Sequence, residues 1–390
     1  MRERQDIARI LKNKEQLGPF PTEKLKRVDQ PTTLITDNVK RFDARQNGFE
    51  KAARGEYGEA VARERARPTK FPLQAALIDM IRQRLAPGIS GDVAPFQAPL
   101  TDDPEILSRH IKSLGYFLRA DIVGICLLPD YAAYSHDKDG NPIELNHKYA
   151  ISVVIDQGYD TMNASSGSDW ISSSQSFRSY TTTAFITSMM ANYIRKLGYP
   201  ARAHFNNNYQ IVVPPLLILS GIGEMSRMGG ATINPFLGPR FKAAVVTTDL
   251  PLVPDKPIDF GLQEFCRVCK RCAEECPSRA IPNGDKVVYN GYECWQLDVE
   301  RCSKFRVTNQ YGAGCGTCIK VCPWNKPGGR LHDAVRWVAQ QIPALDRMLV
   351  KTDSLMGYGR QHKEKQWWFD LEAVDGVIQV PKGKKNESRS

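Results

Sequence analysis

The sequence predicts an α/β protein, built as an α+β sandwich, with a cysteine-rich module in its C-terminal half. Helical and strand patterns alternate along residues 101–247, which favours a sheet packed against helices. All ten cysteines except Cys126 lie between Cys266 and Cys322. With 390 residues, of which 42% are hydrophobic and 25% charged, the chain is typical of a globular protein with a large core.

Residues 1–98 form a predicted lead segment that is helical, basic and rich in arginine. Much of the net charge of +10 gathers here and in the last ten residues, PKGKKNESRS. Solvated helix faces and a disordered tail account for such charge most simply. A docking surface for an acidic redox protein or for nucleic acid is the alternative. Because the segment has no basic run with interleaved aromatic residues, we expect no nucleic acid.

Residues 99–258 form the predicted sandwich. It opens with a helix over residues 103–118, in which apolar residues recur every three or four positions. A longer helix covers roughly residues 176–197 and ends at Gly198. Four apolar runs predict the strands: 121–128, 149–155, 201–205 and 242–247. Cys126 lies in the first of these runs, so we expect it in the core.

Several familiar motifs do not occur in the sequence. No G-x-G-x-x-G follows a strand and no G-x-x-x-x-G-K-[ST] is found, so we expect neither a nicotinamide dinucleotide nor a nucleoside triphosphate. The first residues, MRERQDIARI, resemble neither an apolar signal peptide nor a twin-arginine signal. The longest strongly apolar run, residues 211–219, contains two prolines and is too short to span a bilayer. These features predict a cytoplasmic protein with reduced thiols.

Two cysteine motifs define the predicted module of residues 259–330. The first is the run of bacterial ferredoxins, Cys266-x2-Cys269-x2-Cys272-x3-Cys276-Pro277. The second has a longer opening and the same ending, Cys302-x12-Cys315-x2-Cys318-x3-Cys322-Pro323. We therefore predict a ferredoxin-like module that binds two [4Fe–4S] clusters and transfers single electrons. A C-terminal segment with a basic tail follows at residues 331–390.

Crosswise ligation divides these cysteines into two sets, because the fourth cysteine of such a run ligates the neighbouring cluster. The first cysteine set is Cys266, Cys269, Cys272 and Cys322. The second cysteine set is Cys276, Cys302, Cys315 and Cys318. Cys294 is surplus, although it could replace Cys302. Zinc binding is the alternative, but it does not explain the proline after each terminal cysteine.

The tail of the predicted sandwich, GPRFKAAVVTTDLPLVPD at residues 238–255, precedes these two motifs. This order resembles the reductive dehalogenases over residues 100–330. The resemblance implies a nitroreductase-like core that holds cobalamin, as a base-off corrinoid, beside the nearer of two [4Fe–4S] clusters. In that family no histidine of a D-x-H-x-x-G motif ligates the cobalt, and none of the six histidines here lies in such a motif.

The same resemblance implies roles for six side chains. Tyr180 matches the family's proton donor, and either Arg240 or Lys242 matches its basic partner. Lys242 and Arg306, together with Ser176 one helical turn before the tyrosine, match the soluble catabolic members that attack ortho-halogenated phenols. The implied substrate-binding residues are Ser176, Asn206 and Arg240, and the implied catalytic residues are Tyr180, Lys242 and Arg306.

The implied reaction replaces a carbon–halogen bond by carbon–hydrogen, using two electrons and one proton. A neighbouring lysine would favour the phenolate of the tyrosine after it has given up its proton. Lys242 and Arg306 would also stabilise an anionic substrate such as a phenolate. A ferredoxin, a flavodoxin or a separate reductase could supply the electrons, and the oligomeric state stays open.

Other interpretations of these residues stay open as well. The run CGTCIKVCPWN at residues 315–325 also resembles epoxyqueuosine reductases, which act on tRNA with the same cofactors. A non-catalytic electron carrier is a further alternative. A tyrosine on an amphipathic helix most often packs in a core, whereas Lys242 and Arg306 could be solvated surface charges.

Overall fold

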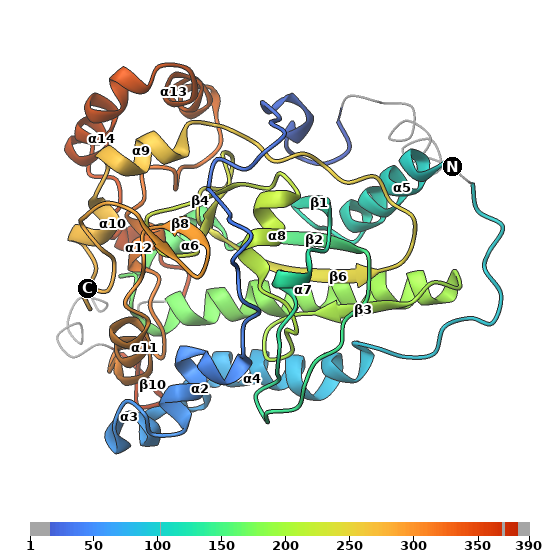
Figure 1. Ribbon diagram of the computed structural model, residues 1–390. Coiled ribbons are helices and arrows are strands. Elements are labelled where there is room, and N and C mark those ends of the chain that lie inside the picture. Colours follow the sequence, from blue (N-terminus) through green and yellow to red (C-terminus); the bar gives the residue numbers. More distant parts are fainter. Residues whose placement is uncertain (1–15, 102, 369–370, 381–390) are drawn as a thin grey trace.

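The computed structural model describes residues 16–101, 103–368 and 371–380. A four-stranded sheet forms its centre, with α7 along one face and α8 on the other (Figure 1). The strand order is β1-β2-β6-β3, and every neighbouring pair is antiparallel. The bounds of the four strands are Ile122–Leu127 for β1, Tyr149–Asp156 for β2, Phe241–Thr248 for β6 and Ala201–His204 for β3. The predicted mixture of helices and strands is confirmed, and each strand lies within one residue of its predicted run.

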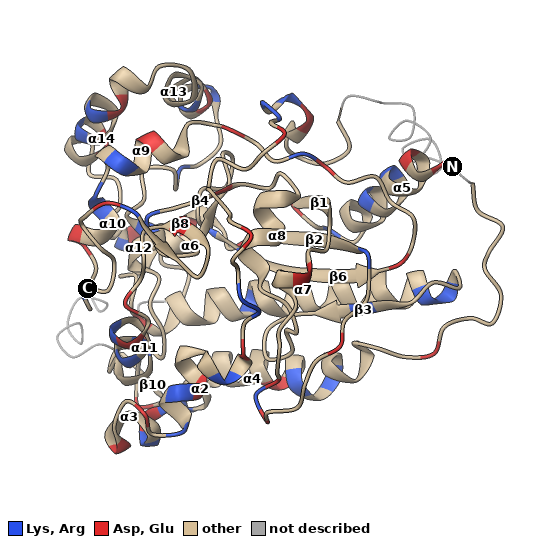
Figure 2. Ribbon diagram, in the orientation of Figure 1, with Lys and Arg blue, Asp and Glu red and all other residues tan. Residues whose placement is uncertain are grey.

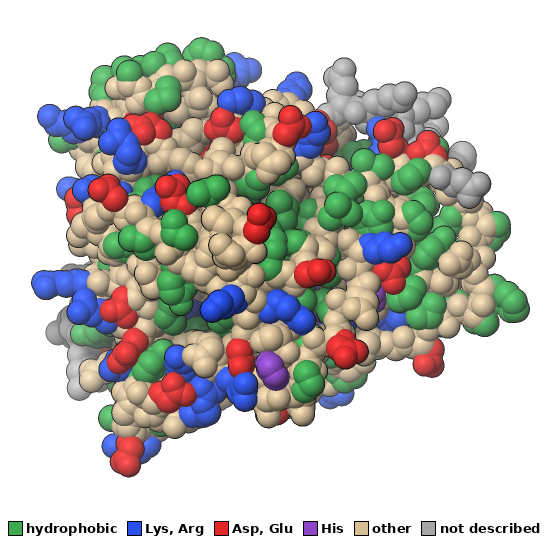
Figure 3. Space-filling view, in the orientation of Figure 1, with side chains coloured by type: hydrophobic (Ala, Val, Ile, Leu, Met, Phe, Trp, Pro, Cys, Tyr) green, Lys and Arg blue, Asp and Glu red, His purple; other side chains and the backbone are tan. Residues whose placement is uncertain are grey.

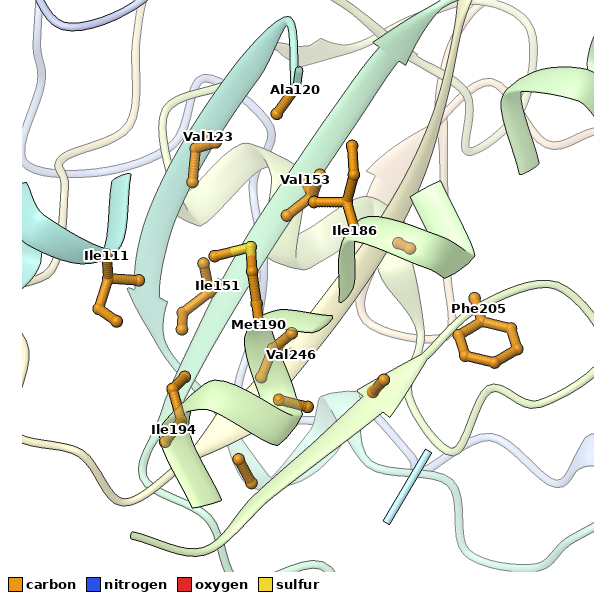
Figure 4. Packing of buried hydrophobic residues seen from close by; sticks show 14 of the residues in the cluster. Ile111, Ala120, Val123, Ile151, Val153, Ile186, Met190, Ile194, Phe205 and Val246 are labelled. Carbon is orange, nitrogen blue, oxygen red and sulfur yellow. The ribbon is translucent and has the colours of Figure 1, made fainter. Parts of the chain in front are cut away.

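Alternate residues of each strand point to opposite faces, so the sheet has a core on both sides. On one face, Val123, Ile151 and Val246 pack against Ile186 and Met190 of α7 (Figure 4). On the other face, the side chains of β1, β2 and β6 pack against α8, Val213–Leu219. The buried side chain of Cys126 belongs to this second face, as predicted.

Helix α7, Trp170–Lys196, begins six residues earlier than predicted. Its first turns are serine-rich and carry no apolar period, but the carboxylate of Asp169 accepts a hydrogen bond from the Ser172 amide and caps the helix. Gly198, at φ +89°, ends the helix as predicted. Helix α5, Pro104–Phe117, matches its predicted range and is capped by Asp103.

The lead segment contains short helices rather than one long one. They are α2 at Gly48–Ala53, α3 at Glu59–Glu64 and α4 at Pro72–Asp79, with a π-helix at Met80–Leu85 and 3-10 turns at Thr22–Lys24, Ala44–Gln46, Arg67–Lys70 and Ala86–Gly88. Lysine, arginine and acidic side chains are mixed along α2 and α3 (Figure 2). Residues 1–15 and the basic tail at 381–390 lie outside the described residues.

The lead segment runs across the rest of the molecule. The backbone of Arg27 forms an antiparallel β-bridge with Ile258 of the core, and that of Ile35 forms one with Tyr292 of the cysteine-rich module. Helix α2 packs against α11 of the module, and α4 packs against α7. The described part of this segment is thus joined to both the sandwich and the module.

The cysteine-rich module combines short helices with one hairpin. Its elements are α9 at Leu262–Val268, α10 at Arg271–Glu274, β7 at Val287–Tyr289, β8 at Tyr292–Cys294, α11 at Val299–Thr308 and α12 at Thr317–Lys320. The chain before the module also contains α6 at Tyr159–Ala164, β4 at Glu224–Met225 and β5 at Thr232–Ile233, and a 3-10 turn at Asp130–Ala132 follows β1.

Two helices and a small hairpin complete the described chain. Helix α13 spans Arg330–Gln341, α14 spans Asp346–Leu355, and β9 at Glu372–Val374 pairs with β10 at Val377–Gln379; 3-10 turns lie at Pro343–Leu345 and Lys363–Lys365. Hydrophobic side chains gather on the outer face of α13, at the top left of Figure 3, where Leu331 and Trp337 are exposed. No helix among the described residues is both long and apolar enough to cross a bilayer.

Candidate active site and cysteine sets

The first cysteine set lines one small cavity. Its four side chains are each 6–7% exposed and line the cavity together with residues of the β4–β5 loop and Pro323. Helices α9 and α10 and the turn after α12 bring these cysteines together. Phe260 and Phe265 pack edge-on against Trp324, at ring-centre distances of 4.9 and 5.6 Å, and close the cavity on one side.

The chemistry of this cavity fits a metal cluster. Burial raises the pKa of Cys266 and Cys272 to about 12 and that of Cys269 to about 11. Metal binding would offset this penalty, because the positive charge of iron favours the thiolates. No three cysteine, histidine or acidic side chains in the described ranges converge on a single-ion site. The thiols surround a volume instead, as the ligands of a polynuclear core must.

The second cysteine set is more open than the first. All four of its side chains are partly exposed. Burial raises the pKa of Cys302, and Arg306 partly offsets this rise. The thiols of Cys315 and Cys276 raise the same pKa, so these three thiols are electrostatic neighbours. Burial would also raise the pKa of Cys276, but hydrogen bonds from Ser278 and from backbone amides outweigh it and lower that pKa.

Cys294 lies apart from both sets. It packs against Ile218, Met225 and Tyr292 in a small apolar cluster. Burial raises its pKa, and its described electrostatic neighbour is Lys286 rather than another cysteine. The structure therefore groups Cys302, and not Cys294, with the second cysteine set.

Tyr180 and Lys242 lie together at one end of the sheet. Tyr180 projects from the middle of α7, and Lys242 is the second residue of β6. The Lys242 ammonium nitrogen is 5.3 Å from the centre of the Tyr180 ring. Phe177 packs edge-on against the same ring at 6.0 Å. Tyr209, whose hydroxyl donates to the carbonyl of Ala243 at 2.8 Å, is an electrostatic neighbour of Tyr180.

Ser176 lies one turn before Tyr180 on α7. Its hydroxyl accepts a hydrogen bond of 2.7 Å from the side-chain amide of Gln157, which follows β2. The side-chain carbonyl oxygens of Gln157 and Asn206 are buried and have no hydrogen-bond partner among the described residues. Corrinoids carry amide groups around the ring, and such groups would satisfy these two acceptors. The two unpartnered oxygens therefore fit the amide groups at the edge of a corrinoid.

Arg240 lies close to this site but is already engaged. Its side chain is buried and forms two hydrogen bonds with the Asp156 carboxylate, at 2.7 and 3.1 Å. The remaining end of the guanidinium donates to the Asn325 side chain and to the Lys326 carbonyl. Of the two basic residues expected beside the tyrosine, the structure thus places Lys242 against the ring, whereas Arg240 joins β2 to the end of the second motif.

Arg306 lies on α11, four residues after Cys302. Its guanidinium stacks over Phe49 of the lead segment, 4.6 Å from the ring centre, and Arg65 approaches the same ring at 5.4 Å. The Nε atom of Arg306 is buried and unpaired within the described ranges. Its ring contact is therefore with Phe49 rather than with Tyr180. Phe49 and Gln157 carry no sequence motif, so only the fold could reveal them.

This chain is similar to known proteins both in its cysteine-rich module and over most of its length. Residues 265–325 match the family of the 4Fe-4S double cluster binding domain. The tetrachloroethene reductive dehalogenase of Sulfurospirillum multivorans is 32% identical over 312 residues, which cover 69% of this chain and 60% of that protein. That of Desulfitobacterium hafniense strain Y51 is 39% identical over 241 residues, covering 59% of this chain and 41% of that protein.

A solved structure extends the likeness to nearly the whole chain. The catabolic reductive dehalogenase NpRdhA, in complex with 3-bromo-4-hydroxybenzoic acid, is 42% identical with a TM-score of 0.91. The match covers 98% of this chain and 56% of that one. The chain thus spans about 60% or less of the length of the relatives named here. On this likeness of sequence and fold, the chain belongs to the reductive dehalogenase family.

Proposed function

We propose that this protein is a corrinoid-dependent reductive dehalogenase that acts on halogenated phenolic compounds. In the balanced reaction, the substrate takes up two electrons and one proton, the carbon–halogen bond breaks, and a carbon–hydrogen bond and a halide ion form. The contact between Lys242 and Tyr180, next to a double-cluster module, carries this proposal. The relative bound to a brominated hydroxybenzoic acid supports the phenolic substrate class.

Tyr180 supplies the proton in this proposal, and Lys242 stabilises the phenolate that remains. An ammonium group over an aromatic ring favours negative charge that develops on that ring. Ser176, on the same face of α7, and Asn206, on the loop before Tyr209, would hold the substrate or the corrin edge. Arg306 would stabilise the negative charge of a phenolate substrate, whereas Arg240 acts on the site through Asp156.

Residues of this chain would hold the two clusters and the corrinoid. The first and second cysteine sets would each bind one [4Fe–4S] cluster, and the buried amide oxygens of Gln157 and Asn206 would face the corrinoid. When bound, the corrinoid supplies the strongly reducing centre that attacks the carbon–halogen bond. A low-potential donor, such as a ferredoxin, a flavodoxin or a separate reductase, would refill the clusters, and a cytoplasmic location is part of the same proposal.

Bromide release tests the proposal directly. Protein loaded anaerobically with both clusters and cobalamin, and given a low-potential reductant, should release bromide from 3-bromo-4-hydroxybenzoic acid. Tyr180→Phe should lower turnover by about 10²–10⁴-fold, the range for loss of a general acid. Tyr193→Phe is the matched control, since Tyr193 lies on the same helix but its hydroxyl pairs with His110 at 2.8 Å. It should keep near wild-type turnover.

Two other outcomes would replace this function. No bromide from any of a series of bromophenols, with cofactors fully loaded, would contradict dehalogenation. Reduction of epoxyqueuosine in a tRNA stem–loop would then favour the alternative suggested by the epoxyqueuosine reductase of Atelocyanobacterium thalassa, which is 33% identical over 113 residues. Loss of both activities with intact electron transfer would indicate an electron carrier.

A further inference from the structure

Arg227 is a fully buried cation that the reaction does not use. It lies in the loop between β4 and β5 and is 1% exposed, and it is the largest of the fully buried side chains. Within the described ranges no carboxylate forms an ion pair with it. An unpaired charge in a protein interior is costly unless its hydrogen bonds are satisfied, so such a group needs an explanation.

The guanidinium of Arg227 is held by backbone carbonyls of the cysteine-rich module. Its Nε donates to the carbonyl of Cys266 at 3.0 Å. One terminal nitrogen donates to the carbonyls of Pro282 and Gly284 at 2.9 and 2.8 Å, and the other donates to that of Arg267 at 3.3 Å. The Trp295 ring lies 4.7 Å from its central carbon. These contacts satisfy the hydrogen bonds but leave the positive charge in place.

Arg227 also lines the cavity of the first cysteine set. The same cavity is bounded by Ser226 and Met228 on either side of it in the sequence and by the four thiols. A [4Fe–4S] cluster in this cavity would carry one more negative charge after reduction. Because Arg227 is buried, its charge would be screened far less than a surface charge.

We propose that Arg227 is a positioning residue that raises the reduction potential of the cluster held by the first cysteine set. Its buried charge stabilises the reduced state more than the oxidised state, because the reduced cluster is more negative. The proposal rests on the assignment of a cluster to this set, as in the proposed function, but not on dehalogenation. Failure of the proposed role of Arg227 can therefore be distinguished from failure of the proposed dehalogenase function.

A potentiometric titration of the clusters, followed by electron paramagnetic resonance and without substrate, tests this proposal. Arg227→Gln removes the charge and should lower the ratio of reduced to oxidised cluster at least tenfold at the wild-type midpoint, which for one electron is a shift of about 59 mV. Only one of the two midpoints should move. The signal altered in a Cys322→Ser variant identifies the cluster of the first set.

Two further variants separate charge from structure. Arg227→Lys keeps the charge but loses the forked hydrogen bonds. At the wild-type midpoint, its ratio of reduced to oxidised cluster should therefore stay within about threefold of the wild-type value. Arg267→Gln is the matched control: it also removes one cation near Cys266, but its side chain is 59% exposed and pairs with Glu264. Its midpoint should not change.

The proposal is overturned if Arg227→Gln leaves both midpoints in place, or if Arg267→Gln shifts the midpoint equally. If Arg227→Gln does not bind its clusters, Arg227→Lys decides alone. A lysine variant with the wild-type midpoint and reduced thermal stability supports the role of charge. If the ratio of reduced to oxidised cluster in the lysine variant falls tenfold at the wild-type midpoint, the carbonyl contacts, rather than the charge, set the potential.

Discussion

The two cysteine sets come from similar motifs but are held by different physical means. The first set is almost fully buried, enclosed by aromatic rings, a buried cation and the C-terminal helices. The second set is partly exposed. The loop between α11 and α12, residues 309–316, presses onto the start of α7. A Cβ atom at Gly312 would lie 2.5 Å from the backbone of Asp169, and one at Gly314 would lie 2.7 Å from the Ser173 hydroxyl.

The two sets also contact different parts of the molecule. The loop between α11 and α12, which carries Cys315 of the second set, touches the start of the helix on which Tyr180 lies. The first set is anchored instead by the β4–β5 loop and by α9, which packs against α14. Similar sequence motifs thus end in unlike environments because the chain outside the motifs determines what covers them.

Loss of one ligand from each set should give the largest effect. Cys322→Ser should remove about half of the iron, and it should lower the melting temperature because it leaves a buried cavity without its cluster. Cys276→Ser should also lose up to about half of the iron but retain more of the thermal stability, since this side chain is partly exposed. Iron analysis and thermal unfolding measure both. Equal destabilisation by the two variants would contradict the contrast drawn between the sets.

A methyl group at the contact between the second set and α7 should have the next largest effect. Gly312→Ala forces the Asp169 backbone to move, which should cost about 1–3 kcal/mol of unfolding free energy. Gly284→Ala is the matched control, because no atom lies within 4 Å of the added carbon there. Thermal unfolding of the two variants compares them. If both are as stable as the wild type, the loop does not press on α7.

The helix that covers the first set should respond to pH. Asp346 begins α14, and its buried carboxylate oxygens have no partner among the described residues. Burial, reinforced by Glu264, raises its pKa to about 6. The folded state therefore binds this proton more tightly than the unfolded state. The contribution of Asp346 to stability is thus greatest below about pH 4 and decreases as pH rises from about 4 to 6.

Asp346→Asn should remove this decrease and stabilise the protein at pH 7 by no more than about 3 kcal/mol. Melting temperatures between pH 4 and 7 provide the measurement. Asp333→Asn is the control, since Asp333 is exposed on α13 and pairs with Arg336. A wild-type melting temperature that does not change across this range would exclude Asp346 as the responsible group.

Local features of the fold could be predicted from the sequence, whereas contacts between distant segments could not. The apolar period located α5 and the four strands, because burial imposes that period directly. The first turns of α7 were missed because Asp169 and the serines there stabilise the helix by capping rather than by apolar packing. The antiparallel strand order and the contact between Arg306 and Phe49 depend on pairings that no local pattern records.

The candidate site was predictable only in part for the same reason. The cysteine motifs carry their own spacing, so the two proposed sets followed from residues alone, with Cys294 left as an alternative to Cys302. Tyr180 and Lys242 are 62 positions apart in the sequence, and only a family resemblance suggested that they meet. Arg227 was not predicted, because a single arginine in a glycine-rich loop gives no sign that it will be buried.

The path of the lead segment has a consequence for the way this protein is made. Residues 27 and 35 leave the ribosome well before their β-bridge partners, Ile258 and Tyr292, which lie more than two hundred residues later in the chain. The early segment must stay unpaired until the sandwich and the module exist, and contacts of such high sequence separation form slowly. Docking of this segment is therefore a late step of folding, because both the sandwich and the module must be synthesised before it can occur.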